Sequence, residues 1–335
     1  MTPFFARQSG FGPLAAMLAE SEGQGVIDRL CRDVGVAFEP DQPNRPLAFA
    51  GMSQMFERAA RARGDGALGF RVGAGMRPEE FGPLVDYSLS GTSLLHAIQR
   101  ANRLVALQCN AVSLSLQVNG DAATWVFGYV RGADGVHAQH AMHALPSMVR
   151  VIQTVIGLGP AGIGIELALP AGRPARDVAD LSDVEVRAGR PHFAVTFPSA
   201  WLRRPSAQVI RPRVTLFDVH RHYVPQMPRT LREAIGLMLQ SMVGSGEAGL
   251  DEVAFRLGWS RRKIQSDLRA EGCSFRELVI EARMTRAMAF MREGPHSLVD
   301  VALAVGYSDQ AHFNRAFLAY TGQPPGRWRA RVAGR

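Results

Sequence analysis

Cysteine is scarce in this sequence, and lysine is almost absent. The three cysteines, Cys31, Cys109 and Cys273, are odd in number and far apart, which argues against a disulfide framework and against a zinc site built from cysteines. Lys263 is the single lysine, so arginine supplies nearly all of the positive charge. Because unpaired thiols suit a reducing compartment, we expect a cytoplasmic protein.

Long uninterrupted apolar runs are also missing. The most hydrophobic stretch, residues 151–170, contains Gln153 and Glu166 and is interrupted by a Gly-Pro pair. It is therefore better read as a buried helix followed by a strand than as a membrane span. The first twenty residues lack the order of basic region, apolar core and small-residue cleavage site that secretion requires. We expect neither a membrane partner nor a secreted protein.

The charge is distributed unevenly along the chain. The net charge is +8, and the excess lies after residue 200, since residues 250–335 carry 14 Lys and Arg against 9 Asp and Glu. An apolar fraction of 47% in 335 residues is enough for more than one core. A basic segment behind a nearly neutral one is typical of a nucleic-acid-binding domain joined to a sensing domain.

The front part mixes two periodicities. Apolar residues between positions 47 and 59 recur at helical spacing, and Gly64 closes the run. Residues 111–130 alternate on both sides of Asn119-Gly120-Asp121, which indicates a β-hairpin. The stretches 162–169 and 192–197 look like further strands. These patterns predict an α+β domain over residues 1–204.

The remainder of the chain reads as a linker and a helical tail. Residues 205–228 contain four prolines and scattered arginines without a clear period, which predicts a linker that is partly helical at most. Beyond it, Thr230 with Glu233 and Ser274 with Glu277 have the spacing of helix capping boxes. We therefore predict an all-α domain over residues 229–335, in which two helix-turn-helix units are joined by a long helix.

One layout occurs twice in this tail. Residues 250–268 and 298–317 each contain an apolar helix, a short turn and a second helix. The turn residues are Gly258, Trp259 and Ser260 in the first unit and Gly306, Tyr307 and Ser308 in the second. The glycine supplies the positive φ of a tight turn, the aromatic residue fills the core beside it, and the serine caps the next helix.

The second helix of each unit presents a polar face outward. The outward residues are Arg261, Arg262, Lys263, Gln265, Ser266 and Arg269 in the first unit and Gln310, His312, Asn314 and Arg315 in the second. Gln and Asn can pair with adenine and Arg with guanine in the major groove of double-stranded DNA. A helix over residues 274–291 spans about 27 Å, so the two polar faces can reach successive major grooves roughly 34 Å apart.

Residues 229–335 resemble the DNA-binding domain of the AraC/XylS family of bacterial transcription regulators. The resemblance rests on residues 252–291, on "DVALAVGYSDQAHFNRAF" and on the closing "TGQPPGRWR". It implies base contacts from Arg262, Gln265 and Ser266 in the first unit and from Gln310, Ala311, His312 and Arg315 in the second. Ser266 departs from the family, which usually carries an arginine at that position.

Residues 15–205 resemble the regulatory domain of AraC-type proteins related to the ornithine-utilisation and virulence regulators. The matching stretches are "FGPLVDYSLSGTSLLHAIQRANRLV" and "VEVRAGRPHFAVTFPSAWLRRP". The resemblance implies a domain that senses a small-molecule effector or forms a homodimer. It also implies sequence-specific binding at a promoter, most often with activation through contact with RNA polymerase.

Several polar residues keep more than one interpretation. Arg327 and Arg329 fit either phosphate contacts or a solvated C-terminus, and Arg203, Arg204, Arg211 and Arg213 fit either a solvated or interdomain face or DNA contacts. His137, His140 and His143 share one helical face and could hold zinc, line an effector pocket or serve the structure. No Cys, Asp or Glu at helical spacing completes a metal site, so we predict none. Cys109 fits a buried small hydrophobe or a redox sensor.

Two other classes of protein remain open at this point. An enzyme fused to a DNA-binding tail would need a catalytic set in the front domain, but we find no phosphate-binding glycine loop and no G-x-S-x-G. The glycine-rich "GLGPAG" places a proline where a phosphate loop needs backbone donors. We therefore predict neither catalytic residues nor a cofactor. A constitutive DNA-binding protein without an effector is the second alternative.

Overall fold

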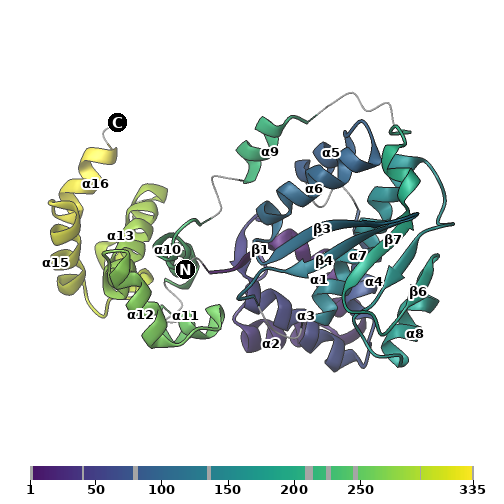
Figure 1. Cartoon of the computed structure of the whole chain (residues 1–335). Helices are drawn as coiled ribbons and strands as arrows, with labels where there is room; N and C mark the ends of the chain where they lie inside the picture. The colour runs from purple at the N-terminus through teal and green to yellow at the C-terminus, as the bar shows by residue number, and fades with distance from the viewer. Residues whose placement is uncertain are drawn as a thin grey trace. The chain divides into compact units, whose positions relative to one another are not determined.

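The computed structural model describes residues 3–39, 41–77, 82–133, 137–207, 214–223, 228–243, 248–294 and 296–333. The chain divides into two compact units, residues 4–227 and residues 228–335, and each is described by itself (Figure 1). The first unit combines a sheet with helices, and the described part of the second is helical. The predicted fold class, α+β followed by all-α, is confirmed.

The first unit is built on a five-stranded sheet with the order β3-β4-β7-β5-β6. Its strands are β3 (Val112–Asn119), β4 (Ala122–Tyr129), β5 (Gly164–Glu166), β6 (Glu185–Arg187) and β7 (Phe193–Pro198). The expected hairpin is formed by β3 and β4, and Gly120 in its turn has a φ of 59°. Leu114 lies opposite Phe127, and Leu116 lies opposite Trp125, so the alternation gathers apolar side chains on one face of the sheet.

Helices cover that apolar face. The helices of this part are α1 (Leu14–Glu22), α2 (Gln24–Val34), α3 (Phe49–Arg63), α4 (Leu68–Gly75), α5 (Pro83–Leu89), α6 (Leu94–Gln108), α7 (Ala138–Ile156) and α8 (Arg173–Asp180). α6 packs on β3, and α7 packs on β4 and β7 (Figure 1). The N-terminal β1 (Phe5–Arg7) pairs with β2 (Pro46–Ala48) in a separate two-stranded sheet. Trp125 on the sheet and Leu145 and Ile152 on α7 are buried in the shared core.

α4 and α7 cross with their backbones in close contact at two glycines. A Cβ atom at Gly69 would lie 1.9 Å from the backbone oxygen of Gln139, and one at Gly73 would lie 2.0 Å from that of His143. The backbone N–H of Gly69 also donates to Oε1 of Gln139 at 2.8 Å. Because residues four apart share one face of a helix, both glycines meet α7. The position of α7 therefore depends on these two glycines.

Part of the segment predicted as a linker, residues 205–228, is packed. It contains α9 (Leu216–Tyr223), whose Val219 and Tyr223 are fully buried in a small apolar cluster with Leu84 and Leu104. One short helix agrees with the expectation of a connector that is partly helical at most. The side chain of Arg204 lies over the ring of Trp201, with 5.7 Å from Cζ to the ring centroid, whereas Arg211 and Arg213 lie outside the described residues.

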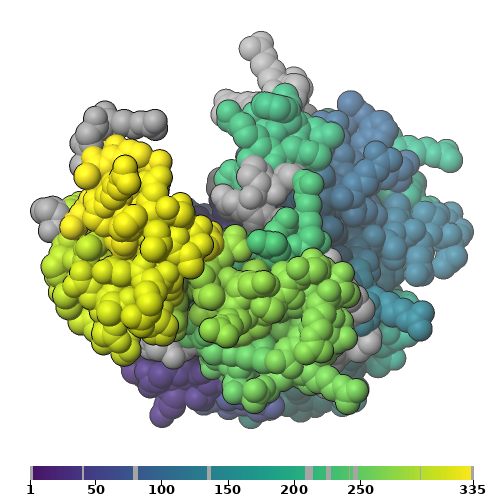
Figure 2. Space-filling view, turned by 90° about the vertical axis from the view of Figure 1, so that its left-hand side faces the viewer, coloured from purple at the N-terminus to yellow at the C-terminus, as the bar shows by residue number. Residues whose placement is uncertain are grey.

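The second unit is organised around one long helix. Its helices are α10 (Leu231–Met242), α11 (Leu250–Leu257), α12 (Arg261–Ala270), α13 (Phe275–Glu293), α14 (Leu298–Ala304), α15 (Gln310–Thr321) and α16 (Pro325–Ala333). α13 begins at a capping box, in which Ser274 and Glu277 exchange side-chain to backbone hydrogen bonds. α13 packs against α10, α14, α15 and α16, and it lies between the α11–α12 pair and α15 (Figure 1). The space-filling view shows the surface of the C-terminal helices in yellow and that of the helices near residue 260 in green (Figure 2).

Two further properties bear on the sequence expectations. In the described parts of the chain, no helix is long and apolar enough to cross a membrane. The three cysteines are free, and Cys109 is buried. Burial raises the pKa of the Cys109 thiol to about 12, which keeps it protonated near neutral pH. Since the thiolate is the reactive form, this favours the small buried hydrophobe over the redox sensor.

Candidate nucleic-acid interface

The first helix-turn-helix unit consists of α11 and α12. Gly258 ends α11 with a φ of 67°, the left-handed conformation that the tight turn was expected to need. Oγ of Ser260 accepts a hydrogen bond from the backbone N–H of Lys263 at 3.2 Å and so caps α12. Ile264 and Leu268 are fully buried, which leaves the opposite face of α12 to the solvent.

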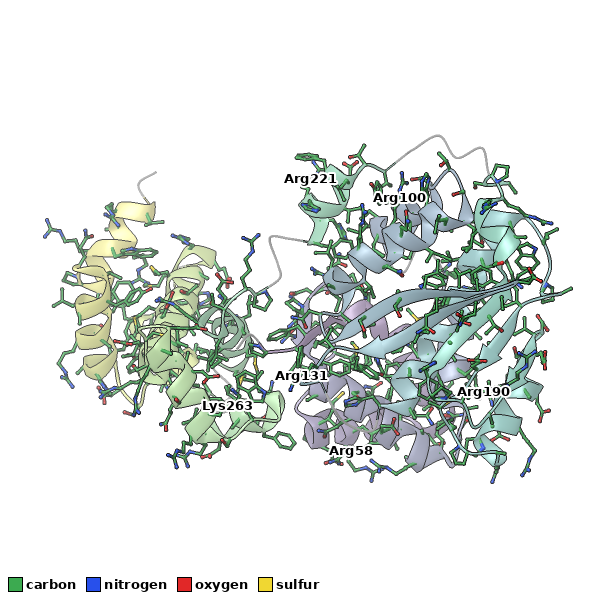
Figure 3. The ribbon with its side chains drawn as sticks, in the orientation of Figure 1. Arg58, Arg100, Arg131, Arg190, Arg221 and Lys263 are labelled. Carbon is green, nitrogen blue, oxygen red and sulfur yellow. The ribbon has the colours of Figure 1, made fainter. Side chains whose placement is uncertain are left out.

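That outer face is basic, but its charges are not equivalent. Arg262, Gln265, Ser266 and Arg269 are exposed. Arg261 is also exposed, with Nη1 placed 3.2 Å from Oδ1 of Asp251. Nζ of Lys263 lies 2.8 Å from Oδ2 of Asp267 and 4.3 Å from the centroid of the Trp259 ring (Figure 3). Trp259 is only half-buried, so it supports Lys263 rather than filling the core as predicted.

The second helix-turn-helix unit consists of α14 and α15. Gly306 has a φ of 81°, and the ring of Tyr307 is buried beside the turn under the guanidinium of Arg283, 5.1 Å from Cζ to the centroid. The sequence predicted that Ser308 caps α15, and this is wrong. The cap is Asp309, whose Oδ1 accepts from the backbone N–H of His312 at 2.7 Å. Ser308 instead donates to Oδ2 of Asp309 at 3.2 Å.

This correction gives a prediction for the stability of α15. Asp309→Ala removes the acceptor of a backbone N–H in the first turn of α15. The melting temperature of the C-terminal compact unit, residues 228–335, should therefore fall by about 4 °C or more. Ser308→Ala removes only a hydrogen bond to the cap and should leave the melting temperature within about 2 °C of wild type. Thermal unfolding followed by far-ultraviolet circular dichroism measures both. A larger loss for Ser308→Ala would restore the original assignment.

The outer face of α15 carries residues of mixed accessibility. Ala311, His312 and Arg315 are exposed, and Gln310 is half-buried. Asn314 differs from the prediction, because its side chain is half-buried and its Oδ1 is buried without a hydrogen-bond partner. Asn314 directly follows Phe313, which together with Phe317 forms the buried side of α15. The side chain of Asn314 is therefore turned partly toward that buried side. Asn314 therefore lies at the edge of the outward face rather than at its centre.

The C-terminal helix α16 separates the two arginines that the sequence grouped together. Arg327 is exposed. Nη1 of Arg329 donates a hydrogen bond to the backbone carbonyl of His296, which ties α16 to the segment before α14. Between them Trp328 is buried, with its ring edge-on to Phe317 and the centroids 5.9 Å apart. The structure thus gives Arg329 an anchoring role and leaves Arg327 at the surface.

Two of the three clustered histidines, His140 and His143, lie in the interior of residues 4–227. His140 and His143 on α7 are buried, and burial lowers the pKa of both imidazoles, to about 4 for His143. His137 precedes α7 and shares a hydrogen bond with Ser53. No group of three His, Cys, Asp or Glu placed to hold a metal ion occurs among the residues that the structure describes.

His140 and His143 line a cavity, which supports the pocket-lining interpretation that the sequence left open for them. The cavity has a volume of about 140 Å³ and lies within the first unit, against the apolar face of the sheet and helices α6 and α7. α7 contributes His140, His143, Ala144 and Ser147 to its wall. These positions form one helical stripe, and small or polar residues on a stripe that faces the core were the signal that could have revealed the cavity.

Comparison with known proteins agrees with this organisation. Residues 26–206 match the family model described as the arabinose-binding domain of AraC transcription regulators, and residues 253–331 match a helix-turn-helix domain. The ornithine utilization regulator of Pseudomonas aeruginosa is 24% identical over 302 residues, which cover 86% of each chain. The regulator VirS of Mycobacterium tuberculosis is 22% identical over 290 residues, 85% of this chain and 84% of that one.

Among solved structures, the transcriptional regulator CdpR of Pseudomonas aeruginosa covers 91% of this chain and 96% of its own, with 18% identity and a TM-score of 0.42. The match to the N-terminal family model alone spans more than half of the sequence. The match to the helix-turn-helix model includes both of the turns described above. The chain therefore belongs to the AraC family of DNA-binding transcription regulators.

Proposed function

We propose that this regulator reads promoter DNA with α12 and α15 and responds to a small-molecule effector held by its first unit. The observation that carries the DNA-binding part is the pair of helix-turn-helix units on either side of α13. α13 has 19 residues, or about 28 Å at the rise of an α-helix. That length suits two helices that enter successive major grooves of one duplex.

The exposed residues of the two outer faces divide into base-reading and positioning groups. Base readers in this proposal are Arg262, Gln265 and Ser266 on α12 and Gln310, Ala311, His312 and Arg315 on α15. Arg261 and Lys263 each have an acidic neighbour in an ion pair, and we assign them, with Arg269 and Arg327, to the phosphate backbone. Asn314 and Arg329 have the weakest support, because the first is partly buried and the second already bonds His296.

The first unit supplies the regulatory half of the proposal. Its match to a family of ligand-binding regulatory domains and its internal cavity support effector sensing. We further propose that the chain acts as a homodimer, that it activates transcription through contact with RNA polymerase, and that it is a regulator rather than an enzyme. The cavity favours this proposal over a constitutive DNA-binding protein, which needs no ligand site in its first unit.

Arg315→Ala tests the base-reading assignment. The DNA sites are selected from random duplexes with the wild-type protein, and affinities are measured by fluorescence anisotropy at fixed salt. The variant should lose about 1–3 kcal/mol of binding free energy at the selected site and discriminate less at one base pair. Arg58→Ala is the matched control, because it removes the same charge from a residue of the first unit that pairs with Asp33 (Figure 3). Wild-type affinity and discrimination in Arg315→Ala would contradict the assignment.

A further inference from the structure

The cavity of the first unit is bounded almost entirely by carbon. The surface that faces it is nearly all apolar. β3 and β4 contribute Leu114, Trp125 and Phe127 to the wall, and α6 contributes Ala101 and Val105. Whatever fills the cavity therefore meets hydrocarbon on nearly every side.

The polar residues of the wall keep their polar atoms out of the cavity. The guanidinium of Arg7 donates to three backbone carbonyls. Three further polar atoms of the wall residues are closed even to a molecule of the size of water, namely Oε1 of Gln108, Nδ1 of His143 and Oγ of Ser147. A charged or hydrogen-bonding group inside the cavity would lose its water without gaining a partner, which is costly. The wall thus selects for an occupant without such groups.

The cavity exists because two helices place small residues where a core usually has large ones. Ala101 on α6 and Ala144 on α7 both line it, whereas Ile98 and Leu145 on the same helices are fully buried in the core. Protein interiors are packed about as closely as organic crystals, and the atoms around a void lose contacts that a filled space would provide. A space that leucine or methionine could fill is therefore more consistent with a ligand site than with a core built for stability alone.

The size of the space limits the occupant. The volume of about 140 Å³ is close to that of an engineered apolar cavity of about 150 Å³, which stays dry and binds benzene. Trp125 and Phe127 in the wall add aromatic surface, against which a further ring can pack offset or edge-on. An occupant of about the size of one ring fits both observations.

We propose that this cavity is the ligand site of the first unit and that it takes an uncharged, apolar molecule of about single-ring size. This inference rests on the proposed effector response and adds the place and the chemical class of the ligand. A sugar fits the wall poorly, although the matching family model is described as arabinose-binding. Each hydroxyl of a pentose that is buried against carbon without a partner weakens binding by about tenfold or more.

The cavity shares part of its wall with the residues that hold α9. Leu84 and Val85 on α5 line the cavity, and the same two residues belong to or pack against the apolar cluster that buries Tyr223. Arg7 also lines the cavity and donates to the backbone carbonyl of Tyr223 at 2.7 Å. A ligand in the cavity therefore packs against residues on which the attachment of α9 depends.

Isothermal titration calorimetry on the full-length protein without DNA tests the proposal. The probes are benzene, phenol, benzoate and L-arabinose, which are all small and differ in their polar groups. Benzene should bind saturably at one site. Phenol should bind about tenfold more weakly, because its hydroxyl loses water and finds no partner in the wall. Benzoate and L-arabinose should give no saturable heat.

Matched substitutions of alanine assign the heat to this cavity. Ala144→Leu fills part of the space and should abolish benzene binding. Ala106→Leu adds the same side chain at an exposed position of α6 outside the wall, and it should bind benzene as the wild type does. A cooperative melting curve shows that Ala144→Leu is folded. Ala101→Val, a smaller change on the opposite wall, should weaken benzene binding about tenfold and tests the same point if Ala144→Leu does not melt cooperatively.

Three results would overturn the proposal. Tighter binding of phenol, benzoate or L-arabinose than of benzene would show that the ligand class is wrong. Benzene heat that persists unchanged in Ala144→Leu and Ala101→Val would place the ligand elsewhere. The absence of saturable heat with benzene would show that the cavity is not a ligand site.

DNA binding by the same preparation separates this inference from the proposed function. Affinity for the selected duplex is measured by fluorescence anisotropy with and without saturating benzene. Benzene binding with a changed DNA affinity supports both the ligand site and the effector response. Benzene binding with an unchanged DNA affinity supports the site and the ligand class and counts against the effector response. Selective DNA binding by a protein that does not bind benzene overturns this inference alone.

Discussion

Replacing Gly73 with alanine should destabilise the first unit by about 3 kcal/mol or more. The new Cβ would lie 2.0 Å from the backbone oxygen of His143 and 2.9 Å from its carbonyl carbon. Both atoms are main chain and cannot rotate away, so α4 and α7 would have to separate by roughly 1 Å or more. Urea unfolding followed by the fluorescence of Trp125 and Trp201, which both lie in the first unit, measures the loss.

Gly25→Ala provides the matched control for this prediction. Gly25 lies in α2 with open space around its position, since nothing is within 4 Å of an added Cβ. Alanine there should stabilise the unit by about 0.4–1 kcal/mol, because it reduces the freedom of the unfolded chain. Gly73→Ala with wild-type stability would show that α4 and α7 are not held at the separation described above. A loss of stability in both variants would show that an added methyl group destabilises the unit at either position, and not specifically at the crossing of α4 and α7.

Much of the second unit could be predicted from the sequence because its signals are local. Gly258 and Gly306 have the positive φ that their turns require, and Ser260 and Ser274 make the hydrogen bonds of their caps. Each of these features depends on residues within four positions of one another. The error at Ser308 arose where two neighbouring residues can both cap a helix, since local sequence does not say which of Ser308 and Asp309 has the extended backbone.

The site in the first unit could not be predicted because it depends on contacts between distant segments. The cavity brings together residues from the N-terminal strand, α6, α7 and the β3–β4 hairpin. His143 could be recognised as part of a helical stripe, but nothing near it in the sequence indicates Gln108 or Arg7 as neighbours. The packing of α9 has the same origin, since Tyr223 bonds Arg7 across more than two hundred residues.

Arg7 joins three separate segments of the first unit. Its side chain is fully buried, and it donates hydrogen bonds to the carbonyls of Leu107 in the last turn of α6, Asn44 before β2 and Tyr223 at the end of α9. The guanidinium also lies over the ring of Tyr223, with 4.6 Å from Cζ to the centroid. One side chain thus donates to backbone carbonyls of three separate segments.

Arg7→Met should therefore cost about 3–5 kcal/mol of stability, because it leaves buried carbonyls without donors while keeping an apolar chain of similar length. Arg7→Lys should recover only part of this loss, since a single ammonium cannot reproduce the three-way geometry of the guanidinium. Urea unfolding followed by Trp125 fluorescence measures both variants.

Arg58→Met is the control for a loss of charge without a loss of buried contacts. Arg58 is at the surface, and its Nη1 lies 3.5 Å from Oδ2 of Asp33 (Figure 3), a separation at which an exposed ion pair contributes about 0–1 kcal/mol. If Arg7→Met were no more damaging than Arg58→Met, the three carbonyls would have other partners, and α9 would not depend on Arg7 for its attachment. A loss confined to Arg7→Met, with partial rescue by lysine, would instead show that the attachment of α9 depends on the same side chain that lines the cavity.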